Sequence, residues 1–273
     1  MPELPEVETI ARTLRTEWQD TPAIVGLAVT GALVYWEKTV AEPDWQLFKD
    51  RIVGQRILEI GRRAKYLVFT LDRDTLLIHL RMSGDLIVGP SGVRLADHVR
   101  LSLELDEKWQ LAFNNPRKFG RVWLVEDPNS FFAKIGPEPF DATLTTEKFW
   151  QRLQRHQRQI KPLLLDQSFI AGLGNIYTDE SLYRSEIHPQ SLANRISLQQ
   201  AGNLLDNIRK VLDEGIQRNG ASIDWVYRGG DFQNYFSVYR QTGKPCAACG
   251  TAIERIVVGQ RGTHICPHCQ VVI

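Results

Sequence analysis

All four cysteines of this 273-residue chain lie near its C-terminal end, in two Cys-x-x-Cys pairs separated by sixteen residues. The pairs are Cys246 with Cys249 and Cys266 with Cys269. Two pairs of thiolates joined by a hairpin-length spacer supply four ligands that converge tetrahedrally on one zinc ion. Two disulfides are the alternative, but thiols stay reduced in the cytosol. The spacing therefore predicts a structural zinc finger over residues 237–273, which needs the metal because it lacks a core of its own.

Three other residues near the cysteines invite a functional interpretation. His264 and His268 are potential zinc ligands, but four thiolates already complete the shell, so we expect both histidines at the surface. The stretch GQRGTH (259–264) places Arg261 between glycines at a hairpin tip, from which a guanidinium can reach a phosphate. A solvated surface arginine is the alternative for Arg261.

The first half of the chain is typical of short β-strands. Runs rich in Val, Ile, Leu and aromatic residues are separated by Gly, Asp, Asn or Pro, which favours strands over the following ranges: 23–29, 56–60, 66–71, 75–80, 99–105, 109–113 and 121–125. No helical pattern alternates with these runs, which indicates an antiparallel sandwich or barrel rather than a parallel α/β sheet.

The second half changes to a helical period after a linker at 134–146, which contains prolines and a glycine. Helices are predicted over 146–156 and 197–216; the second begins with a Ser197–Gln200 capping box, and Gly220 lies just past its end. The expected fold is therefore α+β, with an N-terminal domain (1–133), the linker, a helical domain (147–236) and the finger.

The net charge of +1 is small, but basic residues cluster: 51–65 and 147–161 each carry five bases against one acid. Such stretches within a neutral chain fit one electropositive groove that binds a polyanion, or solvated faces balanced by neighbouring acids. No 18-residue apolar run or export signal is present, so we expect a cytoplasmic protein without a membrane span.

The N-terminal stretch MPELPEVET combines two patterns. Pro5 and Glu6 suit the start of a helix, whose apolar face is formed by Val7, Ile10, Leu14 and Trp18. Pro2 has no part in that helix and would become the N-terminal residue once Met1 is removed.

Seven stretches together resemble the formamidopyrimidine-DNA glycosylases, bacterial repair enzymes that remove oxidised purines. They are PELPEVET (2–9), GRRAKYL (61–67), HLRMSG (79–84), DHVR (97–100), NNPRKFG (114–120), GLGNIYTDESL (172–182) and QRGTH (260–264) with the finger. The resemblance covers the whole chain. It implies an N-terminal β-sandwich with a leading helix, a helix–two-turn–helix domain and a β-hairpin zinc finger, with double-stranded DNA in the cleft between. We expect a monomer, because one asymmetric cleft accounts for every feature.

The resemblance also implies catalytic roles. The secondary amine of Pro2 would attack C1′ of the damaged nucleotide, since an α-amino group titrates well below a lysine. Glu3 would be the general acid/base, Lys65 would serve β-elimination, and Arg261 would serve δ-elimination and contact phosphate. Glu6 is a weaker candidate, with helix-start charge as its alternative.

DNA-handling roles follow from the same resemblance, because a base must be extruded from the stack before it is excised. Met82, Arg117 and Phe119 would fill the void, although Met82 and Phe119 taken alone would more often belong to a core. His98 would contact DNA. Asn175 would bind a phosphate, helped by its neighbouring glycines and the N-terminus of the following helix.

Two departures from the family pattern leave alternatives open. His156 stands where many members have a phosphate-contacting lysine, and Arg155 or Arg158 could take that role instead. The loop at 220–236 lacks an expected Ser/Thr pair and carries Trp225, Tyr227 and Arg228, which puts the preferred lesion in doubt. An endonuclease VIII-like enzyme for oxidised pyrimidines is the nearer rival, although its members usually begin PEGPE. A non-catalytic binder of damaged DNA is the distant one.

Overall fold

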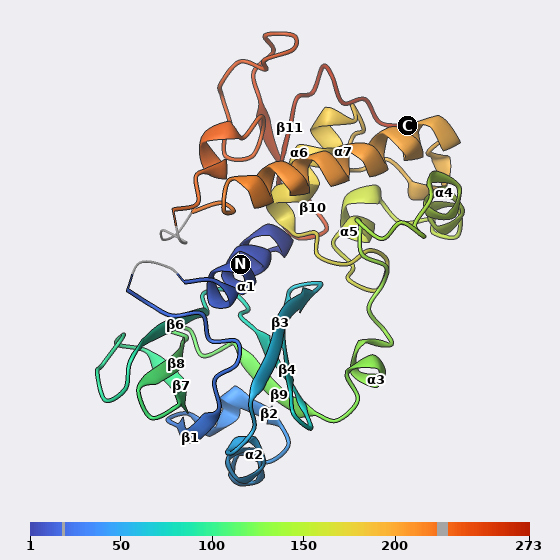
Figure 1. Cartoon of the computed structure of the whole chain (residues 1–273). Coiled ribbons are helices and arrows are strands. Elements are labelled where there is room, and N and C mark those ends of the chain that lie inside the picture. Colours follow the sequence, from blue (N-terminus) through green and yellow to red (C-terminus); the bar gives the residue numbers. More distant parts are fainter. Residues whose placement is uncertain (18–19, 223–228) are drawn as a thin grey trace. The chain divides into compact units, whose positions relative to one another are not determined.

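A computed structural model describes residues 1–17, 20–222 and 229–273 of the chain, which divides into two compact units. The first unit comprises Met1–Pro2 and Val7–Lys134, and the second comprises Glu3–Glu6 and Ile135–Ile273. Helix α1 (Leu4–Arg15) thus contributes residues to both units. The elements are labelled in Figure 1, and each unit is described by itself.

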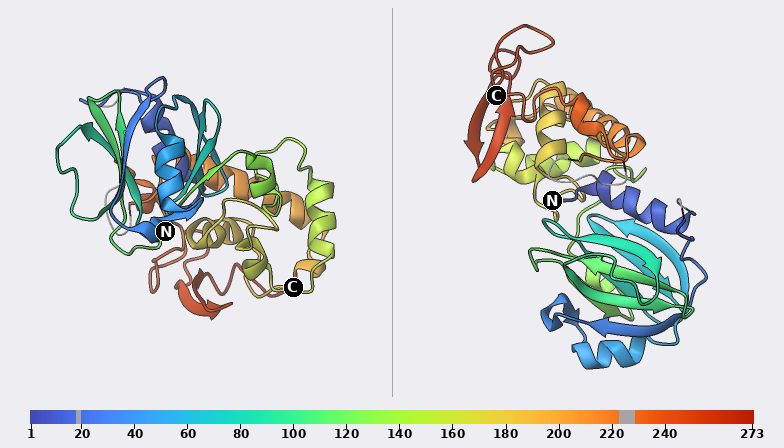
Figure 2. Two further views of the ribbon diagram at one scale, coloured as in Figure 1. Left: turned by 90° about the horizontal axis from the view of Figure 1, so that it is seen from below. Right: turned by 90° about the vertical axis from the view of Figure 1, so that its left-hand side faces the viewer.

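The first unit contains two layered β-sheets (Figure 2). One has four strands in the order β1-β7-β8-β6, and the other has five in the order β2-β9-β5-β4-β3. The strand bounds are β1 (Val29–Val34), β2 (Val40–Glu42), β3 (Ile57–Arg63), β4 (Tyr66–Leu71), β5 (Thr75–His79), β6 (Asp85–Pro90), β7 (Val99–Leu105), β8 (Trp109–Asn114) and β9 (Arg121–Val125). All pairings are antiparallel except the short β2–β9 pair. Two short helices, α2 (Trp45–Ile52) and α3 (Pro128–Phe132), complete the unit.

The predicted antiparallel character of this unit is confirmed, but the strand predicted over 23–29 is wrong for most of its length. Strand β1 starts only at Val29. Gly26 has a φ of +92°, which is incompatible with an extended strand and turns the chain before β1 begins. The burial pattern of β7 and β8 places Leu103 and Leu111 inside, as expected for strands with one face on a core.

The described residues of the second unit form four α-helices that lie wholly within it: α4 (Thr146–Gln154), α5 (Ile160–Leu164), α6 (Asn175–Arg184) and α7 (Leu198–Gln217). The Ser197–Gln200 capping box predicted at the start of α7 is present. The apolar stripe of α7 is buried in a core that also includes Leu4 from the chain start. Gly220, with a φ of +79°, follows the end of the helix, as the C-terminal signal predicts.

The last segment forms the hairpin of β10 (Glu254–Val258) and β11 (Arg261–Ile265), shown in red in Figure 1. Its own apolar cluster is small and is made of Val238, Ile253, Cys246 and Cys266. Short 3₁₀ turns occur at Glu37–Thr39, Ala193–Arg195 and Phe232–Tyr235. Within the described ranges, every helix is too short or too polar to cross a membrane.

Candidate functional site

Glu3 is held at the N-terminal end of α6 by backbone amides. Its carboxylate accepts hydrogen bonds from the backbone nitrogens of Gly174 (2.6 Å) and Ile176 (3.0 Å), and more weakly from that of Tyr177 (3.5 Å). The first N–H groups of a helix have no intrahelical acceptor, and the helix dipole favours an anion at this end. Only 3% of Glu3 is exposed, so its carboxylate has one defined position.

Two glycines make this position of Glu3 possible. A Cβ atom at Gly174 would collide with the carboxylate of Glu3, and one at Gly172 would collide with the side chain of Leu4. Gly172 also has a φ of +89° and accepts a hydrogen bond from the Leu4 amide through its carbonyl. We expected these glycines and the helix N-terminus to receive a DNA phosphate. In this structure the amides of Gly174 and Ile176 bind the carboxylate of Glu3, and the role of Asn175 at a phosphate stays a prediction.

Glu6 is a buried structural group. One carboxylate oxygen accepts from the Glu3 amide (2.8 Å), and the other accepts from the Tyr177 hydroxyl (2.7 Å) and the Ala221 amide (2.8 Å). Glu6 therefore orients the backbone of Glu3. Neither the sequence pattern nor the motif spacing pointed to Tyr177, whose side chain is fully buried.

Pro2 is buried while its nitrogen is part of the Met1–Pro2 peptide bond, and Met1 is exposed. A proline nitrogen in a peptide bond is neither basic nor nucleophilic. The chemistry expected of Pro2 therefore requires removal of Met1.

Lys65 lies in the two-residue turn between β3 and β4, where Arg63 and Tyr66 form the last pair. Ala64 takes a φ of +53° in this turn, and Lys65 is only 4% exposed. The neighbouring His79 pairs with Tyr66 across β4 and β5, and their rings meet edge to face. Burial, together with the charges of Arg81 and Lys65, lowers the pKa of His79 to about 3. Lys65 is therefore close to a histidine that stays neutral.

The three expected void-filling residues are at the surface of the first unit. Met82 is 40% exposed and Phe119 is 51% exposed, and the Arg117 guanidinium lies 5.3 Å from the centre of the Phe119 ring. Met82 follows Arg81, which has a φ of +56°, in the turn after β5. At such exposure neither Met82 nor Phe119 is part of the core. His98 is exposed before β7, and its carbonyl accepts from the Asn115 amide.

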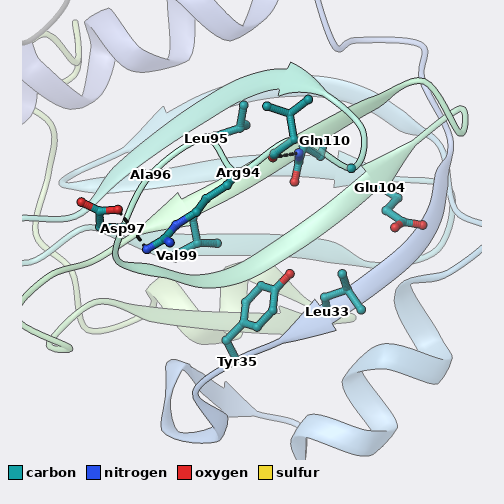
Figure 3. Close-up of a pocket in the computed structure, with 11 residues that line it drawn as sticks. Leu33, Tyr35, Arg94, Leu95, Ala96, Asp97, Val99, Glu104 and Gln110 are labelled. Atoms are coloured by element: carbon teal, nitrogen blue, oxygen red, sulfur yellow. Dashed lines mark hydrogen bonds and ion pairs between the residues drawn. The ribbon is translucent and has the colours of Figure 1, made fainter.

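A pocket with a volume of about 400 Å³ occupies the first unit beside the loop that precedes β7 (Figure 3). Leu33, Tyr35, Leu95 and Gln110 are among the residues that line it. The predicted catalytic and DNA-contacting residues do not line it, although Asp97 and Val99 on either side of His98 do.

Asn175 begins α6 and contacts the finger. Its side-chain nitrogen donates to the carbonyl of Gly262 (2.9 Å), next to the exposed Arg261 at the start of β11. The expected phosphate-binding amide is thus partly used to hold the hairpin.

The four cysteines converge as the spacing predicts. Their sulfur atoms all lie within 4.8 Å of one another, and the Cys249–Cys266 and Cys246–Cys269 pairs are 3.4 and 3.9 Å apart. Zinc–thiolate bonds of about 2.3 Å in a tetrahedron separate the sulfurs by about 3.8 Å. The residues therefore fit one structural zinc ion with a closed ligand shell, whose role is to order the hairpin.

The surface position expected for His264 is wrong, whereas His268 is exposed as expected. His264 is 7% exposed, its backbone nitrogen donates to Asp179 (2.9 Å), and its ring lies against Tyr239. His264 is buried because β11 lies against α6, a long-range contact that local sequence does not encode.

His156, predicted to contact a phosphate, follows the end of α4, as do Arg155 and Arg158, the alternatives for that role. The His156 ring packs edge to face on Phe169, with 5.6 Å between ring centres. Arg158 forms an ion pair with Asp166 (2.8 Å), and Arg155 is exposed. Trp225, Tyr227 and Arg228 lie outside the described residues.

The chain matches three protein-family models. Residues 1–122 match the formamidopyrimidine-DNA glycosylase N-terminal domain, residues 135–226 match the H2TH domain of the same glycosylases, and residues 243–271 match a zinc finger found in FPG and IleRS. The formamidopyrimidine-DNA glycosylase of Chloroflexus aurantiacus is 44% identical over 99% of this chain and 98% of its own length. The chain belongs to the formamidopyrimidine-DNA glycosylase family. The Chloroflexus aggregans member is 43% identical over the full length of both chains.

Solved structures of family members have the same fold. Lactococcus lactis Fpg (MutM), in complex with DNA containing N7-benzyl-Fapy-dG, matches with a TM-score of 0.91 and 36% identity, over 98% of this chain and 99% of that one. A MutM complex with DNA containing carbocyclic 8-oxo-G gives the same values. The family confirms the α+β class, with antiparallel sheets, an H2TH domain and a zinc finger, that the sequence predicts.

Proposed function

We propose that this protein is a base-excision repair enzyme that removes oxidised purines from duplex DNA and then nicks the strand. The observation that carries this proposal is the fixed carboxylate of Glu3, directly after Pro2, at the N-terminus of α6. Solved structures of family members contain DNA with Fapy-dG, carbocyclic 8-oxo-G or an abasic site, which supports the same class of substrates here. 8-Oxoguanine and formamidopyrimidines are therefore the proposed lesions.

The first chemical step uses Pro2 as a nucleophile after Met1 is removed. The unprotonated secondary amine attacks C1′ of the lesion, and the bond from C1′ to the base breaks. Glu3 acts as general acid/base and transfers the protons that the sugar and the leaving base require. The attached amine loses its proton, and the C1′–O4′ bond of the sugar ring then breaks while O4′ takes up a proton from Glu3. The product is an iminium between the Pro2 nitrogen and C1′ of the ring-opened sugar, with the free base released.

The iminium then withdraws electrons from the sugar and permits two eliminations. Loss of the C2′ proton expels the 3′ phosphate, and loss of the C4′ proton expels the 5′ phosphate. We assign Lys65 to the first elimination and Arg261 to the second and to phosphate contact. Hydrolysis of the remaining Schiff base by water frees Pro2 for another turnover.

Access to the base requires extrusion from the stack, for which Met82, Arg117 and Phe119 fill the gap. In this proposal the DNA backbone is contacted by His98, Asn175 and His156. Arg155 or Arg158 is the alternative to His156. The proposed domains are a catalytic domain at 1–133, a linker at 134–146, a DNA-binding domain at 147–236 whose loop 220–236 covers the lesion, and a finger at 237–273. We propose a monomer that acts in the cytoplasm and associates with the nucleoid through DNA.

The test is base release from duplexes that contain 8-oxoguanine, a formamidopyrimidine or thymine glycol, in competition. The proposal expects both purine lesions to be released faster than thymine glycol, and Glu3→Gln to abolish release. Glu147→Gln is the matched control, because Glu147 also lies in the first turn of a helix but is exposed. Release of thymine glycol ahead of both purine lesions would contradict the proposed substrate class.

A further inference from the structure

Asp179 is a buried acid on α6, one turn after Asn175, that the proposed chemistry does not use. None of its side chain is exposed. One carboxylate oxygen accepts from the Lys161 ammonium (2.6 Å), and the other accepts from the backbone nitrogen of His264 (2.9 Å). The His264 ring nitrogen Nδ1 lies 3.3 Å from that second oxygen. Asp179 therefore joins α5 and α6 to β11.

Lys161 extends this connection along the hairpin. Its ammonium is completely buried and also donates to the Thr263 hydroxyl (2.8 Å) and to the Gly262 carbonyl (3.2 Å). The Thr263 hydroxyl in turn donates to the carbonyl of Arg261 (3.0 Å). Burial lowers the pKa of Lys161, whereas the Asp179 charge opposes that effect.

Gly262, Thr263 and His264 are consequently all fixed from the helices, directly after Arg261. The strand that these residues form starts at Arg261, whose side chain is exposed. The same helix α6 holds Glu3 at its N-terminus through Gly174 and Ile176. One rigid element therefore sets the backbone positions of both Glu3 and Arg261, within the second unit.

We propose that Asp179 is a positioning residue for δ-elimination, acting through Lys161 and β11 to place Arg261. This inference rests on the proposed function, in which Arg261 serves the second elimination and Glu3 serves base excision. A displacement of about 1 Å in a reacting group is enough to cost up to about a hundredfold in rate. Because Glu3 is bound to the first turn of α6 and Asp179 contacts β11 from the second, loosening of β11 affects the two steps differently.

The experiment uses the full-length, zinc-loaded protein and two variants of different severity. Asp179→Asn removes the charge at nearly constant volume. Thr263→Val is milder, because it removes the hydroxyl between Lys161 and Arg261 but keeps the shape of a side chain that is fully buried. Glu214→Gln is the matched control: it breaks the Arg184–Glu214 ion pair on the last turn of α6, away from β11.

Three quantities are measured on each protein: zinc content, the single-turnover rate of base release from an 8-oxoguanine duplex, and the ratio of δ- to β-elimination products from an abasic-site duplex. We expect the product ratio to fall about tenfold in Asp179→Asn and severalfold in Thr263→Val, with base release reduced less than about twofold. Glu214→Gln should match the wild type both in the product ratio and in the rate of base release.

An unchanged product ratio in zinc-loaded Asp179→Asn would overturn the inference, as would a parallel loss of base release and δ-product. If Asp179→Asn does not fold or bind zinc, the same criteria are applied to Thr263→Val, which then decides. Failure of the proposed function is distinguishable, because the wild type itself would then release no base.

Discussion

The carboxylate of Glu3 lies 2.6 Å from the backbone nitrogen of Gly174, 171 positions along the chain. This contact fixes the residue after Pro2 on a helix end instead of leaving it on a free N-terminal segment. Terminal residues are usually poorly ordered unless they are tied down. An N-terminal nucleophile needs such a support, because its reactivity depends on a defined approach to C1′.

Substitution of Gly174 by alanine tests this support directly. The added Cβ collides with the Glu3 carboxylate, so Glu3 must move away from the amides of α6. We expect the rate of base release to fall at least about a hundredfold, because the acid/base group is displaced. Gly61→Ala is the control, since a Cβ there meets no atom within 4 Å. A Gly174→Ala enzyme of wild-type rate would show that the position of Glu3 does not matter.

Truncation of the exposed wedge residues should separate stability from activity. Met82→Ala and Phe119→Ala remove side chains that are 40% and 51% exposed, so the free energy of unfolding should change by less than about 0.5 kcal/mol. Base release from duplex DNA should fall at least about tenfold, since an unfilled gap leaves the unstacking energy uncompensated. Denaturant unfolding and single-turnover kinetics measure the two effects. A large loss of stability with unchanged kinetics would show that Met82 and Phe119 stabilise the fold and do not act on DNA.

Because His79 is buried and neutral, we expect the free energy of unfolding of the first unit to decrease at acidic pH. The pKa of His79, about 3 in the folded protein, is far below the ordinary 6.5. As the pH falls, His79 is therefore protonated in the unfolded chain at a higher pH than in the folded protein. The stabilising contribution is complete above pH 6.5 and is lost as the pH falls towards 3. Between pH 7.5 and pH 5 it should decrease by about 2 kcal/mol.

The variant His79→Phe keeps an aromatic ring beside Tyr66 but cannot titrate. We expect it to be less stable than the wild type at pH 7.5, because the Arg81 amide loses its acceptor. Its unfolding free energy should nevertheless decline less steeply on acidification. Equal slopes for the two proteins in urea unfolding at several pH values would rule out His79 as the source.

Zinc should be stoichiometric and structural. The finger has only a small apolar cluster of its own, so loss of the metal should unfold the hairpin and with it the position of Arg261. Cys266→Ser removes one ligand, and we expect its zinc content to fall and the δ-elimination product to disappear. Metal analysis of the purified wild type should return one zinc per chain, and a value well below one would contradict the four-thiolate site.

Residue spacing, helix capping and apolar periodicity predicted those parts of the fold that depend on residues close together in the sequence. The spacing of the cysteines correctly predicted that the four thiolates converge. The Ser197–Gln200 pair correctly predicted where α7 begins, and the apolar period predicted which face of that helix is buried. The failures were long-range. His264 is buried only because β11 meets α6. The close packing of Glu3 and Leu4 against Gly174 and Gly172 is likewise a long-range contact that the local sequence did not predict.

The acids that organise the second unit could not be assigned from sequence for the same reason. Asp179 and Glu180 stand side by side in TDES, and both are buried. Asp179 binds Lys161 and β11, whereas Glu180 accepts from the amides of Ser237, Val238 and Tyr239. Two adjacent acids in a helix suggest a solvated face; their partners, 18 to 85 positions away, appear only in the folded chain.

The most direct test of the central claim is borohydride trapping on an 8-oxoguanine duplex, followed by mass spectrometry of the cross-linked peptide. The mature chain should begin at Pro2, and the reduced adduct should join the Pro2 nitrogen to C1′ of the sugar. Blocking the terminal amine should abolish the adduct. Absence of any trapped complex, or an adduct on another residue in a protein whose Pro2 amine is free, would contradict the account.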